Sequence, residues 1–575
     1  MIIGIDLGTT NSAVAVYENG RAVIIPNRQG ERTIPSVFQV KPNGEEVVGQ
    51  AARKSAPSLP HHTVMEVKRL IGTEEVVTIG EKTYRPEEIS SKILRELRQS
   101  AEDYLNANVE EAVITVPAYF TDAQRKATRD AGILAGLKVE RIINEPTAAA
   151  LAFSYEHLKE NRHLLVYDFG GGTFDVSVIE VFDGVVQVLS SAGDNALGGA
   201  DFDAKIIEFI EHTFEAEHGY AMKTITNDEK MLEYSLKQVA EDVKKQLSTQ
   251  LEATIALPFV GLKDNFPVSF HTSLSRAQFE QMIAPLIDRT VLLVEQAMRE
   301  ANLTFRDVSE VLMVGGSTRV PLVRHRMNEL VGESKVRTDV HPDEVVAQGA
   351  AIQGALKSGS IAVGTEFMAI DVCPYTLGIE TNDIEKKEYD IFDPLIKKNT
   401  PIPARKTSRY VTMEDNQTEM WLPIYQGENY YTKDNVLVSD QLRVKNIPPR
   451  PAFEESVDVT FEYDINGMIR VTAVLNSTGE VFEEVIESQH GVMDEEEKSF
   501  AIQRMKKEEE NALLLEHVKQ GIYRARRIQP TLSEKEALQL TQHIDRAERA
   551  LKTGDEKELR AADRQLIEFI LEQID

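Results

Sequence analysis

Three consecutive glycines at positions 170–172 lie between two runs rich in β-branched and aromatic residues. Glycine loses more backbone freedom on folding than any other residue and has no side chain to pack, so folding alone explains this turn poorly. Close approach of a phosphate or a metal ion to the backbone explains it better. A flexible hairpin turn is the simpler alternative.

Two further glycine turns follow strand-like runs. Residues 3–16 and 165–178 share one plan: a strand-like run, an Asp-x-Gly turn and a second strand-like run. These copies predict two related halves, each presenting a phosphate-sized turn to a shared cleft, with two unrelated hairpins as the alternative. A third turn at 315–319 combines two glycines with an arginine, which suits a purine ring held against the backbone. A plain strand–helix turn is the alternative there.

Residues 1 to about 365 alternate short β-branched runs with amphipathic stretches, the pattern of an α/β fold. The chain contains no G-x-x-x-x-G-K-S/T motif, which disfavours a P-loop site. We expect strands at residues 2–5, 13–17, 112–116, 164–167, 176–181 and 311–314. We expect helices at residues 86–105, 121–135, 200–218, 228–247 and 276–301, the last of them capped by Ser275.

The composition changes near residue 366. Eight of the 22 prolines fall between Pro374 and Pro451, a density that is poorly compatible with helix and predicts an all-β domain. Within this stretch the alternation at residues 420–425 predicts one strand with two distinct faces. Asn466 and Gly467, between two strand-like runs, predict a hairpin turn.

From about residue 491 the chain becomes highly charged and nearly free of proline. Residues 494–523 and 533–551 have helical character, and an apolar stripe from Leu559 to Ile574 repeats at helical spacing. We therefore expect the chain to end in a small helical appendage.

The amino-acid composition disfavours several classes of function. There are 64 Lys and Arg against 93 Asp and Glu, a net charge of −29, which disfavours nucleic acid as the main partner. No run approaches 18 apolar residues, so we expect no membrane-spanning helix. The single cysteine, Cys373, cannot form an intramolecular disulfide and fits a reducing compartment. Since the N-terminus also lacks a signal-like stretch, we expect a cytoplasmic protein.

Six motifs follow one another along the chain, at residues 3–12, 67–72, 113–120, 144–150, 168–175 and 314–319. Together they resemble the 70-kDa heat-shock protein (DnaK-type) chaperones. The resemblance covers essentially the whole chain except the last 80 or so residues, where only the helical character is similar. Residues 371–380, 425–429 and 461–467 look closest to the specialised bacterial HscC branch.

The resemblance implies a multidomain fold. Its parts would be an actin-like α/β ATPase domain of two related lobes at 1–366, an interdomain linker at 367–374, a β-sandwich peptide-binding domain at 375–490 and a short α-helical lid at 491–575. The implied function is that of an ATP-dependent chaperone in protein folding and the stress response. ATP binding would dock the linker and open the peptide groove, and hydrolysis would release the linker and close the groove.

The implied cofactors are ATP or ADP, Mg²⁺ and K⁺. The implied partners are unfolded or extended peptide segments, a J-domain co-chaperone and a nucleotide-exchange factor, with neither nucleic acid nor membrane among them. An actin-like or sugar-kinase-like ATPase would share the glycine turns but would not account for the proline-rich β domain or the terminal helices. A regulatory binding module that uses slow hydrolysis as a timer is a third possibility.

The resemblance assigns the phosphate end of a nucleotide site. Thr9, Thr10 and Asn11 would hold the phosphates from one half, and Gly170, Gly171 and Gly172 from the other. Asp6 and Asp168 would hold Mg²⁺ mainly through water, and Thr173 would contribute to a potassium site. Lys68 would contact the γ-phosphate and the attacking water, which Glu145 and Asp175 would orient or deprotonate.

The nucleoside end would be formed by two further groups. Glu241, Lys244, Lys245 and Ser248 are spaced so that they share one helical face, although a solvated charged face is the ordinary reading of such spacing. Gly315, Gly316, Ser317, Arg319 and Asp343 would close the pocket.

Three residues match the family's route from the phosphate site to the surface: Pro117, Arg141 and Asp371. Arg141 and Asp371 also match positions that meet a J-domain co-chaperone. Pro117 could equally be a turn residue and Arg141 a surface charge. The linker departs from the family's all-leucine pattern because it contains Ala369, which puts the strength of its docking in doubt.

Seven residues match positions in the family's peptide groove: Ile379, Thr381, Asn382, Tyr410, Met413, Met420 and Leu422. Extended peptides would bind there through backbone hydrogen bonds and one apolar pocket. Asn382 replaces a customary apolar residue, so we expect an altered peptide preference. Ordinary core packing is the alternative for each of these side chains. The short lid would cover the groove incompletely.

Overall fold

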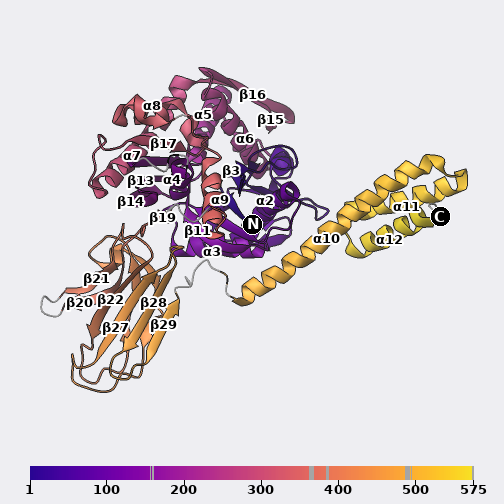
Figure 1. Cartoon of the computed structure of the whole chain (residues 1–575). Coiled ribbons are helices and arrows are strands. Elements are labelled where there is room, and N and C mark those ends of the chain that lie inside the picture. Colours follow the sequence, from indigo (N-terminus) through magenta and orange to yellow (C-terminus); the bar gives the residue numbers. More distant parts are fainter. Residues whose placement is uncertain are drawn as a thin grey trace.

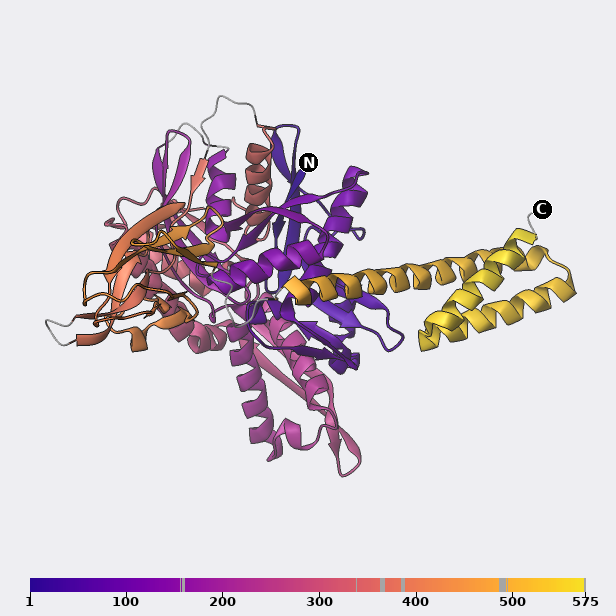
Figure 2. The same cartoon turned by 90° about the horizontal axis from the view of Figure 1, so that it is seen from below.

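The computed structural model describes residues 1–155, 157, 161–337, 339–361, 368–383, 388–485, 493 and 495–572. It has three parts: a mixed α/β part, a β-sandwich below it and a helical tail that projects to one side (Figure 1). Seen at right angles, the tail still points away from both other parts (Figure 2). None of the described helices combines the length and apolar character that crossing a membrane requires.

The first lobe of the α/β part is built on a sheet in the order β11-β10-β1-β2-β3, with β4 paired to β2. Strand β1 runs antiparallel to β2 and parallel to β10, so the glycine turn after β1 lies beside the carboxyl end of β10. The strands are β1 (Ile2–Asp6), β2 (Asn11–Glu18), β3 (Arg21–Ile24), β4 (Ile34–Pro35), β10 (Glu111–Val116) and β11 (Lys138–Asn144).

The second lobe repeats this plan in the order β18-β17-β12-β13-β14, with β19 added at the edge. Here β12 runs antiparallel to β13 and parallel to β17. The two related halves that the sequence repeat predicts are therefore confirmed. The strands are β12 (Arg162–Phe169), β13 (Phe174–Phe182), β14 (Val185–Asp194), β17 (Glu310–Val314), β18 (Val336–Arg337) and β19 (Met368–Ile370).

Smaller sheets and helices complete both lobes. The additional strands are β5 (Val37–Val40), β6 (Glu46–Val48), β7 (Thr63–Met65), β8 (Val77–Ile79), β9 (Lys82–Tyr84), β15 (Glu252–Lys263) and β16 (Phe266–Ser275). The helices are α1 (Gln50–Ser55), α2 (Pro86–Leu105), α3 (Asp122–Leu134), α4 (Glu145–Tyr155), α5 (Gly199–His218), α6 (Glu229–Leu247), α7 (Arg276–Glu300), α8 (Pro321–Val331) and α9 (Val345–Lys357). Each strand and helix expected in the α/β part is present, with ends within two residues of those expected.

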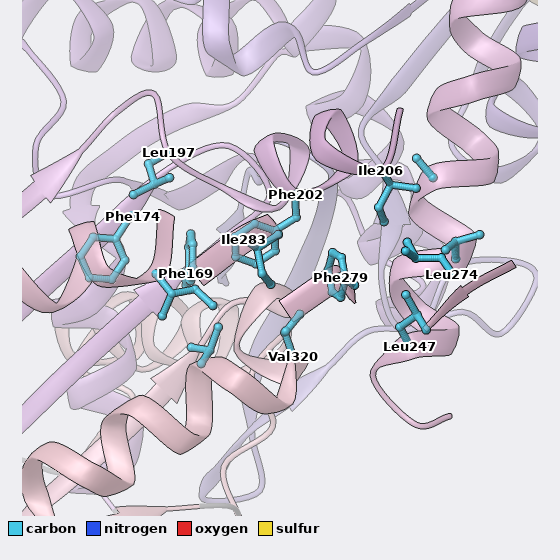
Figure 3. Close-up of a cluster of buried hydrophobic side chains, with 14 of the residues drawn as sticks. Phe169, Phe174, Leu197, Phe202, Ile206, Leu247, Leu274, Phe279, Ile283 and Val320 are labelled. Carbon is cyan, nitrogen blue, oxygen red and sulfur yellow. The ribbon is translucent and has the colours of Figure 1, made fainter. Parts of the chain in front are cut away.

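Apolar periodicity and capping account for these helices. Ser275 caps α7 as expected: its hydroxyl accepts a hydrogen bond from the Gln278 amide, and the Gln278 side chain accepts one from the Ser275 amide. The buried face of α7 supplies Phe279 to the core of the second lobe, where it packs beside Phe202 of α5 (Figure 3). Phe202 in turn contacts Phe169 at the end of β12. The core thus holds the glycine turn at a fixed position.

The β-sandwich consists of the sheets β21-β20-β24-β25 and β22-β27-β28-β29, with β23 and β26 as a separate pair. The all-β expectation is confirmed, and so is the hairpin turn, where Gly467 has a φ of 75° and donates to the Asp464 carbonyl. The strands are β20 (Leu377–Asp383), β21 (Glu388–Ile396), β22 (Ala404–Val411), β23 (Met420–Trp421), β24 (Ile424–Gln426), β25 (Val436–Ser439), β26 (Arg443–Val444), β27 (Ser456–Tyr463), β28 (Ile469–Leu475) and β29 (Val481–Val485).

The single strand expected at residues 420–425 is wrong. The segment contains two strands in different sheets, because β23 pairs with β26 whereas β24 pairs with β20. Pro423 separates them. It has no amide hydrogen to donate to a neighbouring strand, and only its carbonyl is used, accepting from the Glu380 amide.

The linker docks on the second lobe as strand β19, parallel to β14. Ala369 is buried in the apolar cluster there, so its small side chain does not prevent docking. Phe367, the first residue of the expected linker, lies outside the described residues.

The tail consists of α10 (Glu495–Ile528), α11 (Glu534–Thr553) and α12 (Glu556–Glu572), which share one apolar core. The helical expectation is confirmed, although the domain boundary expected at 490/491 lies outside the described residues. The lid was expected to cover the peptide groove incompletely, but in this structure the tail points away from the β-sandwich (Figure 1). The start of α10 lies instead against the first lobe, where Ala501 and Met505 pack on Leu134 (Figure 1).

Candidate functional site

A cavity of about 740 Å³ lies between the two lobes. Each lobe contributes the glycine turn between the first two strands of its repeat, so the duplicated fold places the two turns face to face. The cavity is lined by almost all of the predicted nucleotide residues: Asp6, Thr9, Thr10, Asn11, Lys68, Glu145, Asp168, Gly170, Gly171, Thr173, Glu241, Lys244, Lys245, Ser248, Gly315, Gly316, Ser317, Arg319 and Asp343. The two remaining ones, Gly172 and Asp175, are not among the lining residues.

The structure shows why the second turn requires glycine, which the sequence did not show. A Cβ atom on Gly171 would overlap the Thr10 hydroxyl of the opposite turn, and one on Gly172 would lie 2.7 Å from the Thr9 Cγ2 atom. The glycines therefore let the two turns approach each other. A third turn joins them, because the Ser317 hydroxyl donates to the Gly170 carbonyl at 2.7 Å.

One lysine lies at the base of the cavity. Lys68 follows β7 in a short helical turn and is only 4% exposed. Its Nζ atom donates to Glu145 Oε1 at 2.6 Å and lies 5.4 Å from the centre of the Phe120 ring. Glu145 is the first residue of α4, directly after β11, and is likewise buried. A predicted catalytic lysine and carboxylate are thus in contact.

Three further carboxylates surround this pair. Asp6 accepts a hydrogen bond from the Thr115 hydroxyl at 3.2 Å, and Asp175 accepts one from the Tyr119 amide at 3.3 Å. Burial, followed by the charge of Glu145, raises the pKa of Asp6 and of Asp175 to about 7. The same two causes raise the pKa of Asp168 well above its usual range. One lysine therefore faces four carboxylates, which leaves the base of the cavity short of positive charge.

This base suits a hydrated divalent cation. Among the described residues, no three His, Cys, Asp or Glu side chains are arranged to hold a metal directly. Mg²⁺ commonly keeps several waters and takes one or two carboxylates together with substrate phosphates. Asp6, which is half-buried, and Asp168, which is buried, both line the cavity and fit that mode of binding. Thr173 lies beside them, and its carbonyl accepts from the Gly170 amide.

The far end of the cavity is lined by α6. Burial opposes ionisation of Glu241, but hydrogen bonds from Arg53 and Lys245 lower its pKa to about 2. Lys244 pairs with Asp203 at 2.7 Å and donates to the Gly199 carbonyl. Sequence reasoning missed Arg53, which crosses from the first lobe to the second, since no motif marks it.

The remaining residues of this end are also ordered by local contacts. Arg319 pairs with Asp343 at 2.6 Å at the rim of the cavity. Ser248 donates to the Lys244 carbonyl, so its hydroxyl is bound to its own helix.

All three residues that were predicted to form a route to the surface are buried in this structure. Pro117 is buried at the end of β10, while Arg141 and Asp371 are 7% and 3% exposed. Asp371 accepts a hydrogen bond from the Thr147 hydroxyl of α4, the helix that begins with Glu145. Burial lowers the pKa of Arg141, and the charge of Asp371 opposes that shift. The surface-charge reading of Arg141 is therefore wrong.

Sequence reasoning missed how the β-sandwich meets the first lobe. Asn466 in the hairpin turn accepts a hydrogen bond from the Ile142 amide at 3.2 Å. Asp122 at the start of α3 accepts one from the Ile469 amide at 3.0 Å. The sequence marked Asn466 only as a turn residue, and no sequence feature marked Asp122.

The predicted peptide-groove residues fall into two sets. Ile379, Met420 and Leu422 are buried in the core of the β-sandwich with Tyr410 against them. The Tyr410 hydroxyl donates to Asp393 at 2.6 Å. Thr381 and Met413 are half-buried outside that cluster, while Asn382 is exposed and accepts from the Asp390 amide.

A comparison with protein-family models finds one that matches nearly the whole chain. The model described as Hsp70 protein matches residues 2–77 and 74–573. Members of this family bind ATP or ADP with Mg²⁺, hydrolyse ATP, and act on unfolded peptides together with co-chaperones. The matched residues include both glycine turns, the linker, the β-sandwich and the tail. The chain therefore belongs to the Hsp70 family of ATP-dependent chaperones.

Proposed function

We propose that the cavity between the lobes binds ATP with its phosphates between the two glycine turns and its nucleoside toward α6. The observation that carries this proposal is one buried lysine among four carboxylates, three of which line the cavity that those turns close. An anionic triphosphate and its cation together would supply the charge balance that the base lacks.

In the proposed reaction Lys68 exchanges its contact with Glu145 for the γ-phosphate, which neutralises charge on the transferred group. Glu145, once free, and Asp175 are then the two candidate bases for the attacking water. The pKa of Asp175, about 7, suits acceptance of a proton near neutral pH. Mg²⁺ held by Asp6 and Asp168 would withdraw charge from the phosphate oxygens. Thr173 is proposed as a potassium ligand.

We further propose that this site controls the β-sandwich through the linker. Thr147 of α4 connects Asp371 of the linker to the helix that carries Glu145. A change at Glu145 can therefore alter the contact that holds the linker. Because Arg141 and Asp371 are buried here, a J-domain co-chaperone would reach them only after this segment rearranges.

The β-sandwich is proposed to bind extended apolar peptides through the seven groove residues. Ile379, Met420 and Leu422 would line a pocket that opens from the core. Placement in the HscC branch, a nucleotide-exchange partner, a role in the stress response and a cytoplasmic location are parts of the same proposal.

The test is the steady-state ATPase rate with and without an extended apolar peptide. We expect peptide to change the rate in the wild type and to lose that effect in Asp371→Asn, which retains the shape of the side chain but removes its charge. A Lys397→Ala variant, exposed near the linker, is a control that should respond as the wild type does. No peptide effect in the wild type would contradict the proposed coupling between the two sites.

A further inference from the structure

A second cavity, of about 650 Å³, lies where three parts of the chain meet. Helix α3 of the first lobe lines one side, strands β22, β27 and β28 with their adjoining turns line another, and Lys498 at the start of α10 completes the lining. It shares no lining residue with the cavity between the lobes. Its volume lies within the range of roughly 300–1,000 Å³ that is usual for small-molecule sites.

The lining of this cavity is basic although the chain is acidic. It carries five basic side chains against three acidic ones, in a protein whose net charge is −29. The basic residues come from all three walls: Lys126 and Arg129 from α3, Arg405 and Arg470 from the β-sandwich, and Lys498 from α10. Cations that converge on one hollow raise the local concentration of anions there.

Four of these five cations are neutralised by carboxylates. The pairs are Lys126 with Asp122 at 2.9 Å, Lys498 with Asp130 at 3.2 Å, Arg405 with Glu462 at 3.0 Å and Arg470 with Glu483 at 3.3 Å. These four side chains therefore shape the walls of the cavity and contribute little unpaired charge.

Arg129 is different. Within the described part of the chain no carboxylate pairs with it, and the one acceptor that its Nη1 atom meets is the Met468 sulfur at 3.3 Å. Its Nε atom is buried and has no acceptor among the described residues. A thioether is a weak acceptor, so neither Nε nor Nη1 has a strong acceptor among the described residues. Such a group matches the two oxygens of a carboxylate or phosphate.

We propose that this cavity binds a small organic anion whose carboxylate or phosphate group contacts Arg129. The apolar body of the ligand would lie against Met468, Pro403 and Ala404. Because the walls belong to three parts of the chain, the ligand binds only when the β-sandwich and tail lie against the first lobe. Binding must therefore favour that arrangement. The proposal does not depend on hydrolysis at the other cavity.

Calorimetric titration of the full chain tests the site. Phenyl phosphate and benzoate are separate probes that distinguish a phosphate from a carboxylate ligand, and benzyl alcohol carries the same ring without charge. Each titration is made with saturating ATP, which competes for the cavity between the lobes. We expect one or both anions to bind, at least tenfold more weakly in Arg129→Gln. Arg299→Gln, an exposed arginine on α7, should bind like the wild type.

Equal affinity in Arg129→Gln, equal binding of benzyl alcohol or no binding of either anion to the wild type would overturn the proposal. Hydrogen exchange of the wild type provides a second readout that needs no variant. The Ile142 and Ile469 amides are bonded across the interface, so a bound anion should slow their exchange while benzyl alcohol does not. Unchanged exchange with a saturating anion would also overturn it.

Discussion

Two buried lysines, Lys68 in the cavity between the lobes and Lys92 beneath the tail, have closely similar surroundings. They are 4% and 3% exposed, and each lies near a phenylalanine ring. The Lys68 Nζ atom is 2.6 Å from Glu145. The Lys92 Nζ atom is 2.7 Å from Glu46 and 2.7 Å from Glu508 of α10. Geometry alone does not separate these two sites.

The balance of charge does separate them. Lys68 is outnumbered by four carboxylates, and burial raises the pKa of two of them, Asp6 and Asp175, to about 7. At the tail, Glu508 has a second lysine, Lys82, at 3.1 Å. Burial opposes ionisation of Glu508, but the two lysines lower its pKa to about 2. A buried cluster with unmatched charge is therefore suited to bind a ligand, whereas a matched cluster joins two parts of the fold.

The largest expected effect concerns the unmatched cluster. Lys68→Ala removes the cation that is proposed to neutralise the γ-phosphate, so kcat should fall at least ~100-fold. Nucleotide should still bind, because α6 and the glycine turns are unchanged. Single-turnover hydrolysis and equilibrium binding of ATP measure the two effects. Lys92→Ala is the control, because it also removes a buried lysine but one that lies outside the cavity. Retained turnover in Lys68→Ala would refute the role assigned to Lys68.

The second prediction concerns the matched cluster. Lys92→Ala removes the buried cation between Glu46 and Glu508, and breaking a buried ion pair costs about 3–5 kcal/mol. Since Lys82 still pairs with Glu508, we expect the lower end of that range and a weaker contact between the tail and the first lobe. Small-angle X-ray scattering should show a larger radius of gyration. Lys519→Ala, which removes an exposed pair with Glu45, should scatter like the wild type.

The third prediction uses pH at the unmatched cluster. Because the pKa of Asp175 is raised from 3.8 to about 7, its ionisation destabilises the nucleotide-free fold progressively as pH rises through that interval. Asp175→Asn should therefore raise the free energy of unfolding at pH 8 by on the order of 1–3 kcal/mol, and by less at pH 5, where only part of that interval has been crossed. Calorimetry at both values measures this, and equal shifts at both would contradict the charge argument.

The smallest expected effect has the opposite dependence on pH. The pKa of Glu508 is lowered to about 2, so its ionised form stabilises the docked tail above about pH 4.5, and that contribution is lost as pH falls toward 2. Glu508→Gln should loosen the tail at pH 7 and differ less from the wild type at pH 3. Hydrogen exchange in α10 measures both states. A difference that grows on acidification would count against the matched cluster.

Local patterns predicted much of the fold because they depend on neighbours in sequence. The period of apolar residues located the helices and strands of the α/β part, and Ser275 marked the start of α7. The repeated glycine turns predicted two related halves before any pairing was known. The alternation of apolar residues gave a wrong prediction at residues 420–425. The alternation continues through Pro423, but the strand ends before it and a second strand begins after it.

Site residues that belong to a sequence motif could be predicted. Residues outside any motif that form bonds between parts of the chain could not. The cavity lining includes the lysine, carboxylates and glycines that the motifs marked. Arg53 and Asp122 carried no such signal, because their partners Glu241 and Ile469 lie far away in sequence and meet them only after the parts assemble.

The sequence by itself determined the periodicity, the turns and the family to which the chain belongs, since these follow from local backbone preference and ordered motifs. Tertiary structure alone decided that the tail lies on the first lobe and that a basic cavity forms between three parts. It also decided which buried lysine has its charge matched. Burial and long-range pairing set the free energy of a charge, and neither can be read from its neighbours along the chain.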